Sequence, residues 1–173
     1  MLYMLPEIAL TAQLIGRMRD HFGDAVIVYH SRLTDNRRAD VYRRLIGGSG
    51  GRLVVGVRSS VLLPLPLLSL VIVDEEHENS FKQADSAPRY HGRDTAVMLA
   101  ALCGAKTLLG SATPSVESYF NAATGKYGLV TLAERYGGAV LPRVIVSDTL
   151  RAAKRGEKRS HFNKVLLDRI GEA

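Results

Sequence analysis

Short apolar runs that end in polar clusters are the feature of this sequence that most limits its fold. Residues 53–57 read Leu-Val-Val-Gly-Val and precede Arg58, and residues 70–73 read Leu-Val-Ile-Val and precede Asp74. A third predicted strand, residues 106–109, is also followed by polar residues. Short apolar runs without polar alternation are typical of parallel strands that are buried on both faces. The sequence therefore predicts an α/β fold in which these polar clusters meet at one edge of the sheet.

Predicted helices alternate with the strands, as an α/β sheet requires. Residues 8–22 carry apolar side chains at helical spacing, and Thr34 is a suitable N-cap for a helix that reaches Ile46. We expect a mostly parallel sheet with helices on both faces. The other predicted elements are strands at 1–5, 25–29, 129–132 and 144–146, and helices at about 94–103, 114–124 and 162–170.

The acidic cluster Asp74-Glu75-Glu76-His77 is the strongest functional signal. A carboxylate at the end of a buried strand can hold Mg²⁺, and a second one beside it can orient the water that attacks a γ-phosphate. Three alternatives remain open. The cluster could be an acidic turn, a metal-dependent hydrolase site of Asp74, Glu75 and His77, or a zinc site of His77 and His91. The last has a spacing that fits no usual zinc pattern.

The turn Gly110-Ser111-Ala112-Thr113-Pro114 has a structural interpretation. Thr113 is a suitable cap for the next helix, and Pro114 suits a first helical turn. Because this turn and the acidic cluster both follow strands, the two should be neighbours. A role in sensing the state of a nucleotide is then the functional interpretation.

Two further segments carry groups that bind phosphates or bases. Arg58, Ser59 and Thr11 supply a guanidinium and hydroxyls beside predicted strand ends or helix starts, which are ordinary phosphate-binding parts, although capping explains them equally well. The loop at residues 78–91 interleaves aromatic and basic side chains, as surfaces that bind single-stranded nucleic acid do. The alternative is a surface loop anchored by two aromatic residues. The loop residues in question are Phe81, Lys82, Arg89 and Tyr90.

Composition limits the kinds of ligand that the chain can bind but does not identify one. Lys and Arg number 23 against 17 Asp and Glu, a net charge of +6, which permits phosphate binding. The single cysteine, Cys103, excludes an internal disulfide or a cysteine-based zinc site, and its apolar surroundings predict a core position. The glycine run at residues 47–51 and Gly125-Lys126 both lack the Gly-Lys-Ser/Thr of a P-loop.

Taken in order, these segments resemble the PriA family (primosomal protein N′) of superfamily 2 DNA helicases. The resemblance runs from Met1 to about Ile170. Its most specific part is the aromatic-rich loop directly after the acidic cluster, at residues 81–83 and 88–94. The other matching segments are residues 5–11 for motif Ia, 30–31 before the second helix, 56–59 for motif Ib, 74–77 for motif II and 110–114 for motif III.

The resemblance implies a RecA-like lobe and a role for each segment. Asp74 would coordinate Mg²⁺ and Glu75 would position the attacking water. Glu76, His77 and the turn of Gly110, Ser111, Ala112 and Thr113 would link nucleotide state to movement. The residues expected to contact DNA are Thr11, Arg58, Ser59, Phe81, Lys82, Arg89 and Tyr90.

The resemblance also implies an activity for the full-length parent. It would use ATP and Mg²⁺ to move 3′→5′ along single-stranded DNA, act at stalled replication forks and help to assemble the primosome. Its partners would be single-stranded and forked DNA and the replication-restart proteins, in the bacterial cytoplasm near the nucleoid. No apolar run is long enough for a membrane span. Zinc would belong to the parent and not to these residues.

We expect residues 1–150 to form the first helicase lobe without its P-loop, and residues 151–173 to form a basic linker toward the second lobe. The apolar start at residues 1–5 resembles the end of a buried strand, so the family's P-loop would precede Met1. The chain alone should then hydrolyse ATP negligibly. The alternative function is a non-catalytic module that binds DNA or a protein.

Overall fold

The computed structural model describes all residues except 49–52, 85–86, 135–136, 138–143, 160 and 173. It contains two compact units, Met1–Leu129 and Val130–Ala173. The first unit therefore ends earlier than the boundary after residue 150 that the sequence led us to expect. The glycine run is described only at Gly47 and Gly48, which follow a helix, and its remaining residues lie outside the described part.

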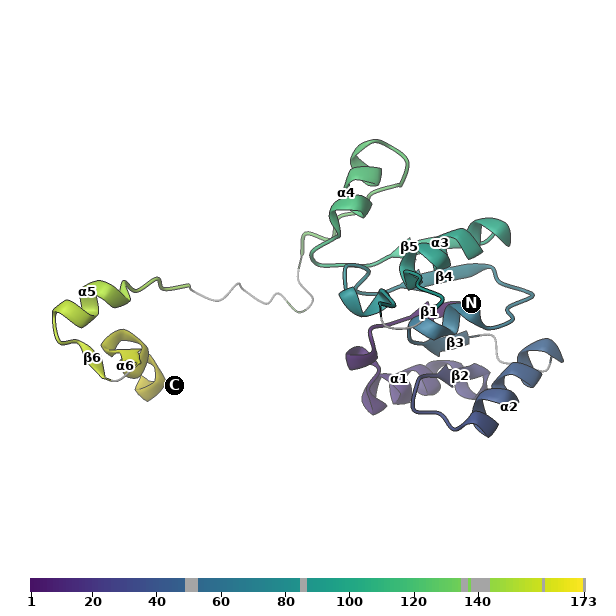
Figure 1. Cartoon of the computed structure of the whole chain (residues 1–173), viewed down its shortest axis with the longest axis horizontal. Helices are drawn as coiled ribbons and strands as arrows, with labels where there is room; N and C mark the ends of the chain where they lie inside the picture. Colours follow the sequence, from purple (N-terminus) through teal and green to yellow (C-terminus); the bar gives the residue numbers. More distant parts are fainter. Residues whose placement is uncertain (49–52, 85–86, 135–136, 138–143, 160, 173) are drawn as a thin grey trace. The chain divides into compact units, whose positions relative to one another are not determined.

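The first unit is built on a five-stranded sheet in which all the strands are parallel (Figure 1). The strand order is β2-β3-β1-β4-β5, so the first strand of the chain lies in the middle. This arrangement confirms the predicted α/β class and is consistent with a RecA-like fold. The strands are β1 (Leu2–Met4), β2 (Val26–Tyr29), β3 (Leu53–Gly56), β4 (Leu70–Val73) and β5 (Lys106–Leu109).

Helices cover both faces of this sheet, as predicted. Successive residues of a strand point to opposite faces. Leu2 and Met4 therefore belong to a cluster that also holds residues of α2 and α3, whereas Tyr3 and Leu5 belong to a second cluster with residues of α1. Full burial of such apolar side chains stabilises the fold by about 1.5–3 kcal/mol each. The helices are α1 (Ala12–Phe22), α2 (Asp35–Ile46), α3 (Gly92–Leu102) and α4 (Val116–Ala123).

Hydroxyl side chains define where three of these helices begin. Thr34 caps α2 as predicted, through the bond that its Oγ1 accepts from Arg37 N. The predicted helix at residues 8–22 is shorter, because Thr11 caps α1 and a separate 3₁₀ turn, Glu7–Ala9, precedes it. Ser115 caps α4, so the prediction that Thr113 does so is wrong.

The predicted strands at residues 129–132 and 144–146 do not form. Their sequences are apolar and β-branched, but an isolated run gains little without a neighbouring strand to pair with. Val130, Val144 and Val146 are 84%, 82% and 92% exposed, which confirms that nothing covers them among the described residues. The helices and strands described in the second unit are α5 (Thr149–Lys154), α6 (Lys164–Glu172) and an antiparallel pair of β6 (Lys158–Arg159) with β7 (Phe162–Asn163).

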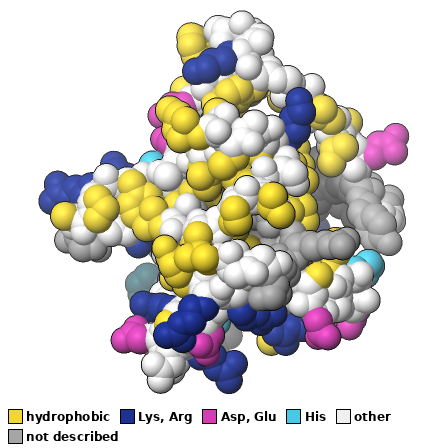
Figure 2. All heavy atoms as spheres, turned by 90° about the vertical axis from the view of Figure 1, so that its right-hand side faces the viewer, with side chains coloured by type: hydrophobic (Ala, Val, Ile, Leu, Met, Phe, Trp, Pro, Cys, Tyr) yellow, Lys and Arg dark blue, Asp and Glu magenta, His cyan; other side chains and the backbone are white. Residues whose placement is uncertain are grey.

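The surface mixes apolar and basic side chains. On the face drawn in Figure 2, hydrophobic side chains gather in the middle, and Lys and Arg side chains lie around them. Cys103 is the C-cap of α3 and is exposed, as are the last two helix residues before it, so the predicted core position is wrong. Within the described part of the chain, no helix is long and apolar enough to cross a membrane.

Candidate functional site

The polar clusters meet at one edge of the sheet, as the strand pattern predicted. Arg58 follows β3, Asp74 follows β4, and Thr113 lies just beyond β5. Because the three strands are parallel, all three residues lie beyond the same ends. The backbones also join the acidic cluster to the turn after β5, since Glu76 N donates to Gly110 O at 3.0 Å.

Asp74 is oriented by two hydrogen bonds. The Tyr3 hydroxyl donates to Oδ2 at 2.7 Å, and the Glu75 backbone N–H donates to Oδ1 at 3.0 Å. Burial, the bond to Asp74 and its negative charge all raise the pKa of Tyr3, so this hydroxyl stays a donor at neutral pH. A methyl group at position 110 would lie 3.3 Å from Asp74 Oδ1, which makes Gly110 suited to this close approach. The carboxylate is thus held in a fixed direction.

Glu75 has the unusual backbone of this site. Its φ of 47° lies in the left-handed region, which costs a residue with a side chain on the order of 1–3 kcal/mol. The side chain is 47% exposed, and its Oε2 lies 3.6 Å from His77 Nδ1. Such strain is often stored at functional positions. Glu75 therefore presents a carboxylate to solvent at the edge of the sheet.

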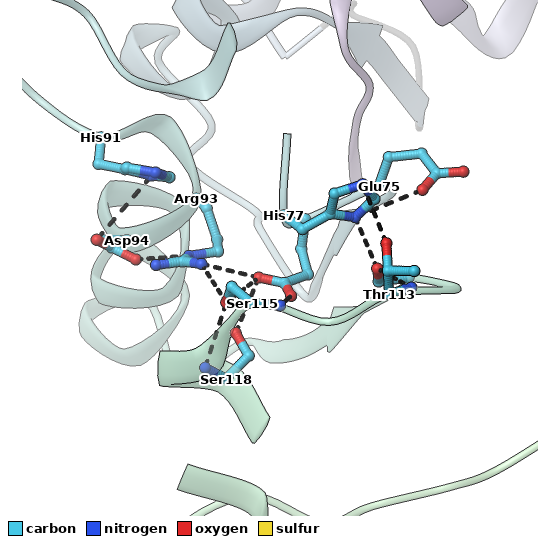
Figure 3. Close-up of polar contacts among 10 residues, drawn as sticks. Glu75, His77, His91, Arg93, Asp94, Thr113, Ser115 and Ser118 are labelled. Atoms are coloured by element: carbon cyan, nitrogen blue, oxygen red, sulfur yellow. Dashed lines mark hydrogen bonds and ion pairs between the residues drawn. The ribbon is translucent and has the colours of Figure 1, made fainter. Parts of the chain in front are cut away.

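His77 joins the acidic cluster to the turn after β5 (Figure 3). Its Nδ1 lies 2.7 Å from Ser111 Oγ, and its Nε2 lies 3.4 Å from Thr113 Oγ1. Ser111 Oγ in turn accepts from Thr113 N at 3.0 Å, which fixes the shape of the turn. The two segments are therefore neighbours, as the sequence predicted, and their side chains are in direct contact.

Glu76 differs from its neighbours because it is buried, with 1% of its surface exposed. Its carboxylate accepts bonds from Arg93 Nη1 at 2.9 Å, from Ser115 N at 2.6 Å and Oγ at 3.0 Å, and from Ser118 Oγ at 2.8 Å. We call these four residues the Glu76 network. Glu76 is thus buried in this conformation, and its contacts tie the acidic cluster to the starts of α3 and α4.

The charges of the Glu76 network are settled by these contacts. Burial raises the pKa of Glu76. The hydrogen bonds from Ser115, Ser118 and Arg93 together lower it by more than burial raises it, so the pKa lies below its ordinary value. Burial likewise lowers the pKa of Arg93, and the bonds to Asp94 and Glu76 raise it above its usual value. Both groups are therefore charged at neutral pH. The pair joins the end of β4 to the first turn of α3.

Sequence reasoning gave no role to Arg93, Ser115, Ser118 or Tyr3. Arg93 is 8% exposed and also donates to Asp94 Oδ1 at 2.8 Å. An arginine at the start of an apolar helix was a signal that could have indicated a buried partner. Tyr3 lies 71 positions before Asp74, and no spacing rule links residues that far apart.

The loop at residues 78–91 has a fixed base. Phe81 is fully buried in the larger core cluster, so in this conformation its side chain is not accessible for the DNA contact expected of it. The anchoring alternative describes it correctly, because a fully apolar ring gains more from the core than from solvent. Gln83 N donates to Tyr90 O at 2.8 Å, and the backbones of Lys82 and His91 form an isolated antiparallel β-bridge. Tyr90 is half-buried against the same core.

The other residues predicted to contact DNA differ in accessibility. Lys82, Arg89 and Thr11 are exposed, although Thr11 Oγ1 already accepts a bond from Leu14 N. Arg58 donates from Nη1 to two backbone carbonyls of the loop, Ser80 O at 3.1 Å and Lys82 O at 2.9 Å. Ser59 is half-buried and lines a pocket of about 190 Å³ beside Arg58. Ala112 is exposed on the turn after β5.

Among the described residues, no group of three or more His, Cys, Asp or Glu side chains is arranged to hold a metal ion. Mg²⁺ does not need such a cage, because it is usually held by one or two carboxylates together with water and substrate phosphates. Asp74, a half-buried carboxylate with a fixed direction, fits that kind of ligand.

No protein-family model matches the chain. Curated proteins do match, among them several that carry the name replication restart protein PriA. The one from Rickettsia prowazekii (strain Madrid E) is 41% identical over 169 residues, which is 98% of this chain and 26% of the relative. Those from Bacillus subtilis (strain 168) and Chlamydia pneumoniae are 40% and 39% identical over 98% of the chain, and 21% and 22% of the relatives are covered.

The chain thus spans about a quarter of the length of the curated relatives it matches. The matched region includes nearly all of its residues, and so it includes the sheet edge, the acidic cluster and the loop. The resemblance found from the motifs is confirmed: this chain is a homologue of replication restart protein PriA over a segment that makes up about a quarter of that protein.

Proposed function

We propose that the chain is part of an ATP-driven DNA motor that acts in replication restart, the process in the name of its relatives. The observation that carries the proposal is the contact of His77 with Ser111 and Thr113. That contact joins the acidic cluster after β4 to the turn after β5. Such a connection is expected in a motor, where ATP hydrolysis at one segment must cause movement of another. The proposal includes 3′→5′ translocation along single-stranded DNA.

Asp74 and Glu75 would carry the chemistry of ATP hydrolysis. Asp74 would hold Mg²⁺, which, when bound with nucleotide, neutralises charge on the phosphates. Tyr3 and the Glu75 N–H keep the Asp74 carboxylate in one direction. Glu75, with a half-exposed carboxylate, would orient the attacking water and receive its proton. Its contact with His77 Nδ1 at 3.6 Å provides a path by which a change at Glu75 reaches the turn after β5.

The DNA track would lie along the exposed basic groups at the same edge. Lys82 and Arg89 are exposed on the loop, Thr11 is exposed at the start of α1, and Ser59 lines the pocket after β3. Phosphate contacts of this kind supply affinity without reading sequence. A motor must bind any sequence, so this chemistry suits it. Single-stranded and forked DNA, together with primosome proteins in the bacterial cytoplasm, are the partners we propose.

Contacts within the chain support a path from the loop to the acidic cluster. The base of the loop continues directly into α3, and Arg93 in its first turn bonds Glu76. Glu76 also bonds Ser115 and Ser118, which begin α4. A shift of the loop base would therefore be felt on both sides of the acidic cluster. This arrangement supports DNA-dependent control of ATP hydrolysis.

The test is ATP hydrolysis by the complete gene product, with and without saturating single-stranded DNA. We expect DNA to stimulate hydrolysis, and Glu75→Gln to reduce the rate by about 10²–10⁴-fold, which is typical for loss of a general base. Glu117→Gln is the matched control, because it removes an exposed carboxylate on α4. An unstimulated enzyme, or a Glu75→Gln variant with the rate of the control, would contradict the proposal.

A further inference from the structure

Arg58 is held in a way that a side chain serving only as a DNA contact would not need. One nitrogen of its guanidinium, Nη1, donates to both Ser80 O and Lys82 O. These two carbonyls flank Phe81, whose ring is fully buried. Residues 80–82 are therefore held in two ways: the Arg58 guanidinium bonds their backbone, and the Phe81 ring is buried in the core.

The surroundings of Arg58 keep it in that place. Its backbone begins the 3₁₀ turn Arg58–Leu62 directly after β3, so it is attached to the sheet. Gly92, the first residue of α3, lies against its stem, since a methyl group at position 92 would be 3.0 Å from Arg58 Cγ. Arg58 is thus packed between the end of β3, the base of the loop and the start of α3.

The same side chain also lines the pocket at the sheet edge. Glu7, Ser31, Ser59 and Ser80 line this pocket together with Arg58. Arg58 therefore borders both the surface where the proposed DNA track would lie and the loop that leads to the Glu76 network. A ligand that binds the Arg58 guanidinium must therefore compete with its bonds to Ser80 O and Lys82 O.

We infer that Arg58 is a positioning residue that fixes the base of the loop at residues 78–91, so that DNA bound at the loop changes the acidic cluster. This inference rests on the proposed function. We call the two bonds from Arg58 Nη1 to Ser80 O and Lys82 O the clamp. Both N–H groups of Nη1 lie in the guanidinium plane, at the end of a side chain that is longer than that of lysine. A lysine keeps the charge, but its tetrahedral ammonium sits on a shorter, flexible stem, so it does not reproduce both the reach and the direction of these bonds. Charge and clamp can therefore be separated by mutation.

The experiment uses the complete gene product with Arg58→Lys, and Arg37→Lys as the control on an exposed arginine of α2. We measure the affinity for a single-stranded oligonucleotide, the stimulation of ATP hydrolysis by DNA, and hydrogen exchange of backbone amides. Phe81, Lys82 and Gln83 report on the clamp, because their N–H groups donate to Glu78 O, Asn79 O and Tyr90 O.

In Arg58→Lys we expect stimulation to fall by about fivefold or more, the lower end of typical coupling between sites. DNA affinity should change by less than about threefold because the charge is kept. The three amides should exchange faster than in Arg37→Lys. Stimulation and exchange like those of the control would overturn the inference and leave Arg58 as a charge alone. A wild-type protein without stimulation would instead overturn the proposed function, while the exchange measurement would still decide on the clamp.

Gly92→Ala is a second variant, which retains the Arg58 side chain but shifts its position. The added methyl group forces the Arg58 stem, or the neighbouring Phe81 carbonyl at 3.4 Å, to move by a few tenths of an ångström. We expect a smaller loss of stimulation in the same direction. Gly16→Ala is its control, because a methyl group there meets nothing within 4 Å. Equal stimulation in the two alanine variants, together with normal exchange in Arg58→Lys, would exclude the clamp.

Discussion

The Glu76 network and the loop at residues 78–91 are neighbours in the sequence, but different kinds of contact hold them. In the network, a carboxylate with 1% exposure receives bonds from an arginine and two serines on two helices. In the loop, Arg58 bonds backbone carbonyls and Phe81 fills the core, whereas Lys82 and Arg89 stay exposed. The network has charged groups that must stay paired, whereas the base of the loop is held by bonds to neutral carbonyls and by a buried apolar ring.

This difference indicates how the two parts divide the work. Separating a buried ion pair leaves a charge without a partner, so the network has one arrangement and resists change. Breaking the Arg58 bonds at the loop base strands no buried charge, because the bonded carbonyls are neutral groups that water can also satisfy. We therefore expect the loop to be the adjustable part and the network to be the rigid part that receives its movement.

Arg93→Ala should have the largest effect on this comparison. The substitution leaves the Glu76 carboxylate buried without its arginine, which typically costs about 3–5 kcal/mol of unfolding free energy. Urea unfolding of this chain, followed by circular dichroism, measures the loss. Arg37→Ala, at an exposed position of α2, is the control. An equal loss of unfolding free energy in the two variants would contradict a special role for the Arg93–Glu76 pair.

A double mutant sharpens that result. Adding Glu76→Gln to Arg93→Ala removes the stranded charge, so part of the lost stability should return. The stability of the double mutant would then lie above that of Arg93→Ala. Simple addition of the two single losses would show that the residues do not act as a pair.

Phe81→Ala should have the next largest effect and acts on the loop. Phe81 is fully buried, so its truncation should cost about 3 kcal/mol or more through lost burial and the cavity left behind. Tyr90→Ala, at a half-buried aromatic of the same loop, should cost less. Equal urea midpoints for the two variants would mean that Phe81 does not anchor the loop.

The sequence predicted the sheet well because parallel strands have a local signature. The runs at residues 53–57 and 70–73 are apolar without interruption, and only a strand buried on both faces needs such a run. The meeting of Asp74, Arg58 and Thr113 at one edge followed from chain direction alone. The false strands at residues 129–132 and 144–146 have a similar local composition, and what they lack is a partner strand.

The side-chain roles were predicted less well, because they depend on contacts between distant positions. Phe81 and Tyr90 are both aromatic residues in a basic loop, and only the structure shows that the first is buried. Arg58 was expected at a DNA phosphate, and its bonds to Ser80 and Lys82 join residues 22 and 24 positions away. Composition indicates what a side chain can bind, and packing decides what it does bind.

Acid should weaken the network in a predictable direction. The folded-state pKa of Glu76 lies below its ordinary value of 4.5, so the unfolded chain binds this proton more readily. The stability that Glu76 contributes is present above that ordinary value and is lost as the pH falls through the lower, folded pKa. Urea midpoints measured at successively lower pH should fall less steeply in Glu76→Gln than in wild type. Glu117→Gln is the control, and a wild-type slope in Glu76→Gln would contradict the assignment.

Lys82→Ala should have the smallest effect and tests the exposed part of the loop. The substitution removes an exposed ammonium but keeps the backbone carbonyl that Arg58 holds, so it changes charge without releasing the clamp. If Lys82 neutralises one phosphate of single-stranded DNA, its loss should reduce the slope of log K against log salt by about 0.7. Binding would weaken by a few-fold at low salt and by less at high salt. Lys126→Ala removes an exposed lysine after α4 and should leave the slope unchanged. Fluorescence anisotropy with a labelled oligonucleotide at several salt concentrations measures both variants in the complete gene product. An unchanged slope in Lys82→Ala would remove this side chain from the DNA track, and the loop would then influence the acidic cluster through its base alone.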